Sequence, residues 1–146
     1  MSRDDVATYV EKTFVAYRGE LLSSGMSSED ADANIARNRS QQFNGDDLVS
    51  GQFILDVVSG DDVVGTLWLG LHNGVGPDWW IYEIEISERF RGTGYGRPTL
   101  AAAEEFVRAQ GGTRLGLNVF GTNAVARHLY EAAGYSVANI EMYKEF

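Results

Sequence analysis

The residues best suited to chemistry lie in the stretch RFRGTGYGRP, residues 89–98. Its three glycines, at 92, 94 and 96, stand between arginines, after an apolar run and before an alanine-rich one. A strand that leads through a glycine-rich turn into a helix presents unpaired N–H groups at the positive end of the helix dipole, where phosphate binds well. Glycines tolerate positive φ there, and arginines add charge-assisted hydrogen bonds. The stretch therefore predicts a phosphate site, although a turn without a ligand would explain the same glycines.

The spacing of these glycines argues against two common nucleotide sites. A dinucleotide-binding fold places G-x-G-x-x-G in a parallel βαβ unit, with an acidic residue about twenty positions later. The strand expected after the glycines, LGLNVF at 115–120, contains no acidic residue. A P-loop needs a lysine after its second glycine, and no lysine is near. A nucleotide-binding protein is therefore disfavoured.

Two blocks of sequence resemble one known family. RGTGYG, from Arg91 to Gly96, is similar to R/Q-x-x-G-x-G/A, the pyrophosphate-binding signature of the GNAT superfamily of acyl-CoA-dependent N-acetyltransferases. N-x-x-A-x-x-L-Y-x-x-x-G-Y, from Asn123 to Tyr135, resembles the family helix that follows it. The resemblance covers roughly residues 63–146 and is weak over the N-terminal third, where the first strand usual in the family is not evident.

This resemblance implies a fold and a cofactor site. The fold is α+β, with a mixed, mostly antiparallel twisted sheet whose central strands splay apart, flanked by about four helices. The co-substrate is acetyl-CoA, with its pantetheine arm in the gap between the splayed strands and its pyrophosphate on the glycine turn. The implied cofactor-binding residues are Ile84, Glu85, Ile86, Arg91, Gly92, Thr93, Gly94, Tyr95, Gly96, Arg97, Asn123 and Tyr130.

Tyr130 is the candidate acid, because it matches the family tyrosine that lies near the cofactor sulfur. A phenol with an ordinary pKa near ~10 stays protonated at neutral pH and can donate a proton to a departing thiolate. The same residue also fits the apolar side of a helix with Ala126, Leu129 and Ala133, so a core position is the alternative. Asn123 either caps this helix or hydrogen-bonds the pantetheine arm.

Two glutamates of the run YEIEI are the candidate bases. Glu83 and Glu85 fall on one face of the expected strand, with the tyrosine and the isoleucines on the other unless a bulge intervenes. If the pantetheine arm runs back along this strand from the glycine turn, its thioester lies several residues before Gly92. This position favours Glu83 as the base, acting through water. A solvated carboxylate pair is the alternative. Where other family members carry glutamate, this chain has Trp80 and Asn118, which supply no base.

We therefore expect an N-acetyltransferase that transfers an acetyl group from acetyl-CoA to a primary amine by direct attack in a ternary complex. The chain contains no cysteine, so a thiol acyl-enzyme is excluded. A non-catalytic acyl-CoA-binding or regulatory module on the same fold is the alternative, because no base is unambiguous. The acceptor is a small-molecule amine or a peptide N-terminus, and the acidic surface slightly favours a cationic one.

The aromatic residues near these motifs are weaker candidates for a functional role. Trp79 and Trp80 are neighbours on a strand and point to opposite faces, so at most one of them lines an acceptor pocket. Trp68 is the third candidate for that pocket. His128 cannot share the direction of Tyr130 on a helix, and we expect it on the surface.

The elements that must position these residues follow from periodicity and turn signals. Two amphipathic helices come first, over 4–23 with Asp4 or Asp5 at its N-cap, and from Ser27 or Ser28 to about Phe43. Three strands follow as an antiparallel meander, at 52–58, 63–71 and 79–87. The remainder is a helix at 97–110, a strand at 114–120, a helix capped by Thr122 or Asn123 and ended by Gly134, and a final strand carrying Val137, Ile140 and Met142.

Length and composition set the outer limits. We expect one domain, residues 1–146, because 44% hydrophobic residues suffice for a core. The formal charge of -9 argues against nucleic-acid binding, and no apolar run is long enough for a membrane span. No metal site is expected from two histidines and no cysteine. The expected location is cytoplasmic, and the exposed final strand could support a homodimer.

Overall fold

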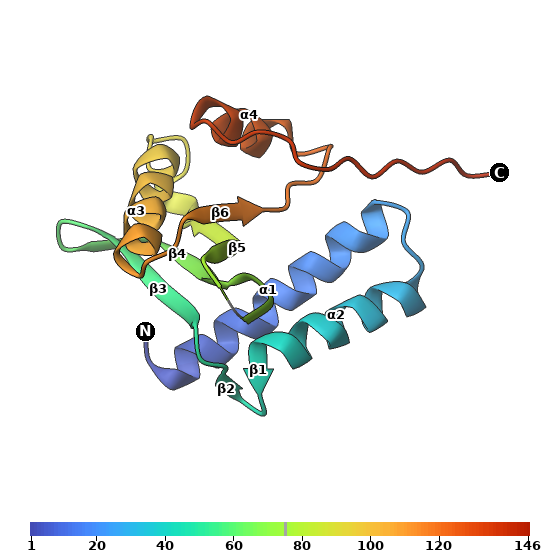
Figure 1. Cartoon of the computed structure of the whole chain (residues 1–146), viewed down its shortest axis with the longest axis horizontal. Helices are drawn as coiled ribbons and strands as arrows, with labels where there is room; N and C mark the ends of the chain where they lie inside the picture. The colour runs from blue at the N-terminus through green and yellow to red at the C-terminus, as the bar shows by residue number, and fades with distance from the viewer. Residues whose placement is uncertain (75) are drawn as a thin grey trace.

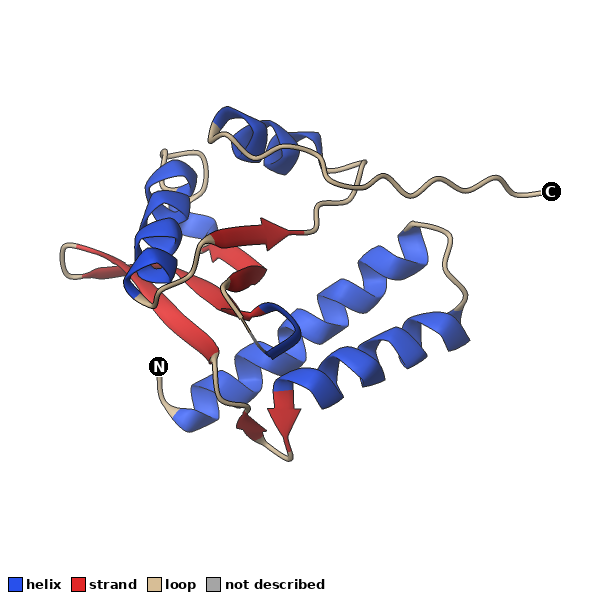
Figure 2. Ribbon diagram, viewed as in Figure 1, coloured by secondary structure: helices blue, strands red, loops and turns tan. Residues whose placement is uncertain are grey.

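The computed structural model of the chain describes residues 1–74 and 76–146. Its helices are α1 (Arg3–Ser23), α2 (Ser28–Gln42), α3 (Gly96–Ala109) and α4 (Ala124–Ala132), with 3₁₀ turns at His72–Gly74 and Glu88–Phe90. Its strands are β1 (Phe43–Asn44), β2 (Asp47–Leu48), β3 (Gln52–Ser59), β4 (Asp62–Leu71), β5 (Asp78–Ile86) and β6 (Arg114–Leu117). Within the described stretches no helix is long and apolar enough to cross a membrane. The expected α+β class is confirmed (Figure 2).

Strands β3 to β6 form one four-stranded sheet in chain order. β3, β4 and β5 pair antiparallel, which confirms the predicted meander, and β6 returns parallel to β5 after α3. β1 and β2 form a separate small hairpin, which the sequence did not predict. The sheet is therefore mixed and mostly antiparallel.

Helices cover both faces of the sheet (Figure 1). On one face, α3 packs Leu100, Ala103 and Val107 against the inward side chains of β4 and β5. On the other, α1 packs around Trp68, whose ring centroid lies 5.9 Å from that of Phe14 in an edge-on contact. Each large apolar side chain buried in this way contributes roughly 1.5–3 kcal/mol. The two cores hold β5, which carries the candidate bases, from both sides.

Both N-terminal helices begin at serines. Ser2 caps α1 in a capping box with Asp5, and Ser27 caps α2 by accepting a hydrogen bond from the amide of Asp30. The predicted start of α2 is confirmed. The prediction of Asp4 or Asp5 as the cap of α1 was wrong, because Ser2 takes that position and Asp5 completes the box from inside the helix.

A β-bulge interrupts β5 at Tyr82. Trp68 of β4 pairs with Glu83, but Leu69 pairs with Ile81, so Tyr82 has no partner in the register. Tyr82 packs on the α1 side of the sheet, with its ring 5.5 Å from that of Trp68. Glu83 faces the charges of α1 as well. The sequence prediction placed Tyr82 and Glu83 on opposite faces unless a bulge intervened, and the structure has that bulge, because an extra residue in one strand re-aims the side chains around it.

The C-terminal part departs most from expectation. β6 ends at Leu117, three residues earlier than predicted, and residues 136–146, here called the tail, form no strand. The final strand predicted from Val137, Ile140 and Met142 was therefore wrong. Strand conformation needs a neighbour that completes the backbone hydrogen bonds, and the tail leaves the sheet after α4 and runs past the end of α1 (Figure 1).

Candidate active site

The glycine turn between β5 and α3 is open to a ligand. Gly92 and Gly94 have φ angles of 72° and 88°, and no heavy atom lies within 4 Å of a Cβ added to either. Gly96 instead starts α3 with negative φ, and a Cβ there would lie 3.2 Å from Leu129 of α4, so this glycine serves packing. The N-cap residue Tyr95 gives no side-chain hydrogen bond, so the first amides of α3 remain available for an anion.

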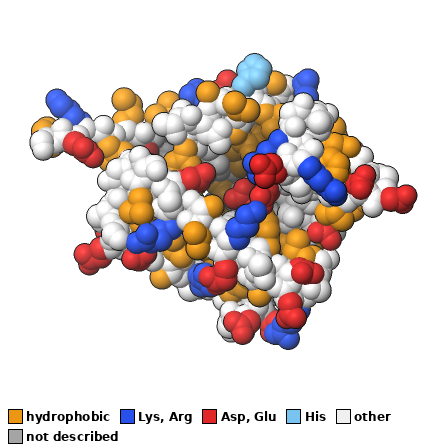
Figure 3. Space-filling model, turned by 180° about the vertical axis from the view of Figure 1, so that it is seen from behind, with side chains coloured by type: hydrophobic (Ala, Val, Ile, Leu, Met, Phe, Trp, Pro, Cys, Tyr) orange, Lys and Arg blue, Asp and Glu red, His pale blue; other side chains and the backbone are white. Residues whose placement is uncertain are grey.

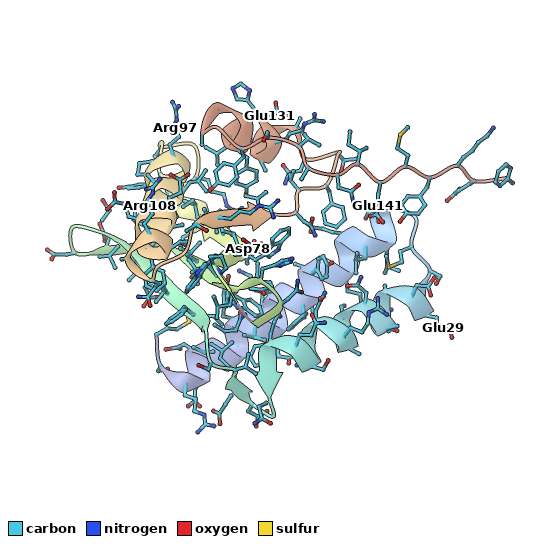
Figure 4. The ribbon with its side chains drawn as sticks, in the orientation of Figure 1. Glu29, Asp78, Arg97, Arg108, Glu131 and Glu141 are labelled. Atoms are coloured by element: carbon cyan, nitrogen blue, oxygen red, sulfur yellow. The ribbon has the colours of Figure 1, made fainter. Side chains whose placement is uncertain are left out.

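The three arginines around the turn differ in their partners. Arg91 donates from Nε to the carbonyl oxygen of Ile86 at 2.9 Å, and its Nη2 lies 3.7 Å from Oε1 of Glu85. Arg89 lies 4.0 Å from a carboxylate at the start of β4. Arg97, at the N-terminal end of α3, reaches only the carbonyl oxygen at the end of α4, at 3.5 Å, and forms no ion pair within the described residues (Figure 4). Arg97 is therefore the arginine best placed for a phosphate group.

β5 and β6 diverge, as the resemblance implied. They pair only over Asp78–Ile81 and Arg114–Leu117, after which β6 ends while β5 continues to Ile86, still paired with β4. The edge of β5 that faces away from β4 is therefore open from the bulge onward. Ile84, Glu85 and Ile86 lie on this open stretch, which leads directly to the glycine turn. Exposed backbone groups here suit an extended ligand that carries amides.

Glu83 lies at the start of this open stretch. Burial raises its pKa to about 7, and the negative charges of Glu20 and Glu85 act in the same direction, while Lys12 opposes them only weakly. A carboxyl group that changes its protonation near neutral pH can accept a proton and release it again. These are the properties that a general base needs, so Glu83 stays the predicted base.

Glu85 has a different environment. Its Oε1 accepts a hydrogen bond from the ammonium group of Lys12 at 2.8 Å and also lies close to Arg91. Both cations occupy lone pairs of this carboxylate. This pairing favours Glu83 over Glu85 as the base and gives Glu85 a role in holding Arg91 against the end of β5.

Tyr130 lies on α4, half-buried against the α3 side of the core. Burial raises its pKa, and the negative charge of Glu83 raises it further, so the two groups sense each other across the site. Its ring contacts that of Tyr135 edge-on, at 6.1 Å. Asn123 caps α4, accepting a hydrogen bond from the amide of Ala126 at 3.2 Å. The capping alternative for Asn123 is therefore confirmed, and Tyr130 remains protonated at neutral pH.

A wide groove separates β6 and α4 from the C-terminal half of α1. Its volume is about 2040 Å³, and Tyr130, Asn118, Glu20 and Trp80 are among the residues that line it. Figure 3 shows a hollow on the face opposite to that of Figure 1, with acidic, basic and hydrophobic side chains around it. A site for a small molecule measures roughly 300–1,000 Å³. The groove is therefore larger than a single acceptor requires.

The positions of the aromatic residues agree in part with the sequence prediction. Trp79 is buried in the α3 core, whereas Trp80 points the other way and stacks on His72 with ring centroids 4.5 Å apart. A Cβ on Gly116 would lie 2.5 Å from the Trp80 ring, so this glycine lets the indole cross β6. Trp79 and Trp80 both border the groove, although most of Trp79 is buried in the α3 core, while Trp68 belongs to the α1 core. His128 is exposed, as expected.

Sequence reasoning missed the contributions of α1 to the site. Glu20 lines the groove, burial raises its pKa, and its charge raises the pKa of Glu83, while Lys12 binds Glu85. Both residues lie in the N-terminal third, where no motif marks them. The helical spacing that predicted α1 identifies its apolar face but cannot show which polar residues meet a strand more than sixty positions away.

Comparisons with known proteins agree with this geometry. The model of the acetyltransferase (GNAT) family matches residues 18–135. The chain is 35% identical over 85 residues to the uncharacterized N-acetyltransferase YycN of Bacillus subtilis, which is 58% of this chain and 54% of YycN. It is 38% identical over 85 residues to the uncharacterized N-acetyltransferase YdgE of the same organism, with shares of 56% and 53%. The chain thus spans about half the length of the curated relatives it matches.

Solved structures show the same fold. The crystal structure of YycN from Bacillus subtilis matches with a TM-score of 0.87 at 27% identity, and the match covers 100% of this chain and 95% of that one. AAC(6')-Iy, solved with a bisubstrate analogue that contains CoA, matches with a TM-score of 0.55 at 13% identity over 92% of both chains. With the family model covering most of its length, the chain belongs to the acetyltransferase (GNAT) family.

Proposed function

We propose that this protein is an N-acetyltransferase that transfers the acetyl group of acetyl-CoA to a primary amine by direct attack. One observation carries the proposal: the open edge of β5 connects a glycine turn suited to pyrophosphate with the carboxylate of Glu83 and the phenol of Tyr130. The groups that could bind an elongated ligand therefore lie in line with a base and an acid for its reactive end.

One half of the proposed site would bind acetyl-CoA. The free amides at the start of α3 and the guanidinium group of Arg97 would hold the pyrophosphate, where Gly92 and Gly94 leave room for it. The open backbone groups of Ile84–Ile86, apart from the Ile86 carbonyl that Arg91 already contacts, would hydrogen-bond the pantetheine amides. AAC(6')-Iy, which has this fold, holds a CoA conjugate in its structure. The residues present therefore fit acetyl-CoA.

The other half of the proposed site would carry out the proton transfers. The amine nitrogen bonds to the thioester carbonyl carbon, the carbon–sulfur bond breaks, the surplus amine proton goes to Glu83 directly or through water, and Tyr130 donates a proton to the thiolate. Because the pKa of Glu83 is raised to about 7, its basic form increases as the pH rises through neutrality. Because the pKa of Tyr130 is raised, its phenol keeps its proton over the same range.

The acceptor is a primary amine that enters from the groove, a small molecule or a peptide N-terminus. Glu20 lines the groove and its negative charge acts on Glu83, so the two carboxylates together attract a cationic group. An amine carrying a second positive charge, such as a diamine or an amino sugar, is the acceptor class that this pair of carboxylates favours.

The test measures release of the CoA thiol from acetyl-CoA in the presence of diamines, amino sugars, amino acids and peptide N-termini. A thiol reagent gives a clean signal because the protein has no cysteine of its own. We expect at least one class of amine to accelerate release, and Tyr130→Phe to suppress that acceleration. Tight acetyl-CoA binding without acceleration by any amine would leave a non-catalytic acyl-CoA-binding module instead.

A further inference from the structure

A second, smaller cavity lies between α1 and the end of β5. Its volume is about 330 Å³, and residues of α1, β4, β5 and the following turn line it, among them Tyr9, Lys12, Thr66, Glu85 and Arg91. The side chain of Lys12 is 67% exposed, so the cavity opens to solvent beside it. A polar cavity of this size admits several water molecules. Among the described residues, none lines both this cavity and the groove, so the two are separate spaces.

Tyr9 is the buried residue at this cavity. It is only 8% exposed, and its hydroxyl group has no hydrogen-bond partner among the described residues. It packs in one cluster with Trp68 of β4, the residue that pairs with Glu83 across the sheet. A buried hydroxyl group without a partner lowers the stability of the fold, so its retention needs an explanation. The hydroxyl group of Tyr9 is thus available to bind water or a reacting side chain.

Glu83 lies between the two spaces. It faces α1 from β5, and burial is the main cause of its raised pKa. Glu20, which lines the groove, and Glu85, which lines the cavity, raise this pKa further, while Lys12 at the cavity opposes them. The negative charge of Glu83 in turn acts on Tyr9. The carboxyl group is therefore coupled to the groove on one side and to the cavity on the other.

The proposed reaction leaves Glu83 with a proton that it must lose before the next turnover. An acceptor in the groove and a cofactor along β5 displace the water on that side of the carboxyl group. Tyr9 gives a second way out. Burial and the charge of Glu83 raise the pKa of Tyr9, with Thr13 acting in the opposite direction, so the phenol stays neutral. A neutral hydroxyl group can accept one proton while it donates another.

We propose that Tyr9 relays the proton of Glu83 to water in the cavity, so that the base is restored from the α1 side of the sheet. This inference rests on the proposed acetyl transfer. The proton of Glu83 passes to the oxygen of Tyr9 while the hydroxyl proton of Tyr9 passes to a water molecule, which gives a proton to the solvent. No tyrosinate forms, and no other reactant is consumed. Tyr9 touches neither substrate and is a positioning residue that acts through Glu83.

The first test is the stability of Tyr9→Phe, which removes only the hydroxyl group. Its melting temperature should equal or exceed that of the wild type, because the group has no partner to lose. Tyr82→Phe is the matched control, since Tyr82 lies in the same cluster but donates its hydroxyl group to the carbonyl oxygen of Leu71 at 3.3 Å. A clear fall in the melting temperature of Tyr9→Phe would show that the hydroxyl group is bound within the protein, and would overturn the relay.

The second test needs neither acetyl-CoA nor an acceptor. Glu83 is titrated by carbon NMR on glutamate-labelled protein, with Glu83→Gln to assign its signal. In Tyr9→Phe it should titrate at a higher pH than in the wild type, because the ionised carboxylate loses a hydrogen-bond donor. The charged and titratable groups that also face it are unchanged in this variant and in Tyr82→Phe, and they are Lys12, Glu20, Glu85 and Tyr130. An unchanged titration in Tyr9→Phe would overturn the proposal whatever the activity.

The third test follows CoA release at pH 8 with an amine that the wild type accepts. Glu83 is then ionised at the start, so Tyr9→Phe should complete the first turnover at the wild-type rate and slow roughly tenfold afterwards. Added imidazole, a small base that fits the cavity, should restore the later turnovers, and Tyr82→Phe should run steadily from the start. A slow first turnover that imidazole does not restore would overturn the relay. A wild type that accepts no amine would contradict the proposed acetyl transfer instead, and the titration would still decide whether Tyr9 contacts Glu83.

Discussion

The regions next to the two ends of β5 differ in how fully their side chains and backbone groups are paired. On the side of the glycine turn, the side chains are paired, and Arg91, Glu85 and Lys12 hold one another against the end of the strand. On the side of β6, the sheet ends in an open edge, a wide groove and an exposed tail. The difference teaches that short-range contacts fix the side chains around the glycine turn, whereas the groove beside β6 is left open to whatever enters it.

This comparison predicts separable effects of substitution. Changes on the cofactor side should alter acetyl-CoA binding or proton transfer. Changes at the groove, for example at Glu20, should alter the affinity for the acceptor amine while leaving the affinity for acetyl-CoA nearly intact. A variant of either class that changes both properties together would break the division.

The largest effect is expected from Tyr130→Phe. Loss of the phenolic proton donor should lower kcat roughly 100- to 1,000-fold, with little change in the affinity for acetyl-CoA. Tyr135→Phe is the matched control, because it removes the same hydroxyl group from the neighbouring ring, which lies beside Glu104 instead of Glu83. Steady-state kinetics and a binding titration separate the two quantities, and an equal loss of affinity would argue against the acid role.

Gly94→Val should weaken acetyl-CoA binding about 100-fold, because a β-branched residue both strains this φ of 88° and fills the open space at the turn. Gly60→Val is the control, since Gly60 has a φ of 61° and equally open surroundings in the turn between β3 and β4. Both variants should lose roughly 1–2 kcal/mol of folding free energy. Calorimetry should find the affinity lost only in Gly94→Val, and equal affinities would remove the glycine turn from the site.

Glu83→Gln should stabilise the fold at pH 8 while it impairs the reaction. A carboxyl group whose pKa is higher in the folded state stabilises below its unfolded pKa and loses that contribution as pH rises through the folded value. The rise from 4.5 to about 7 corresponds to roughly 3 kcal/mol at most. Denaturant unfolding should therefore show the variant more stable than the wild type at pH 8 and no different at pH 4.

The kinetic counterpart of this prediction is a change in the pH profile. The wild-type rate should rise through a pH of about 7, and Glu83→Gln should lose this rise. An unchanged profile would exclude Glu83 as the base even if the stability prediction holds.

The smallest effect is expected from the arginines. Arg97→Ala should weaken acetyl-CoA binding roughly tenfold, because it removes a charge-assisted contact at a solvated site. Arg89→Ala, whose side chain lies toward the carboxylate of Asp62, should have little effect and serves as the control. Equal losses in the two variants would mean that only the overall charge matters.

Most of the cofactor side could be predicted from the sequence, because local signals determine it. The glycines, the start of α3 and the block from Asn123 to Tyr135 lie within short stretches whose spacing carries the information. The bulge at Tyr82 could not be predicted, since it depends on how β4 and β5 settle between two cores. The contributions of Glu20 and Lys12 were equally hidden, because they arise only when α1 packs across the sheet.

The C-terminal error has a different cause. The alternation of Ile140 and Met142 does indicate a strand, but a pattern of apolar residues cannot say which chain supplies the neighbouring strand. Among the described residues the tail pairs with no strand, and its residues adopt neither strand nor helix structure.

Hydrogen exchange measured with and without acetyl-CoA tests the central claim most directly, because it reports where the ligand lies without requiring the acceptor. We expect acetyl-CoA to slow exchange in peptides that cover residues 82–86 and 92–97, the open edge of β5 and the glycine turn, and to leave β3 unchanged. Binding without slowed exchange in these two segments would contradict a cofactor site between β5 and β6, and with it the proposed roles of Glu83 and Tyr130.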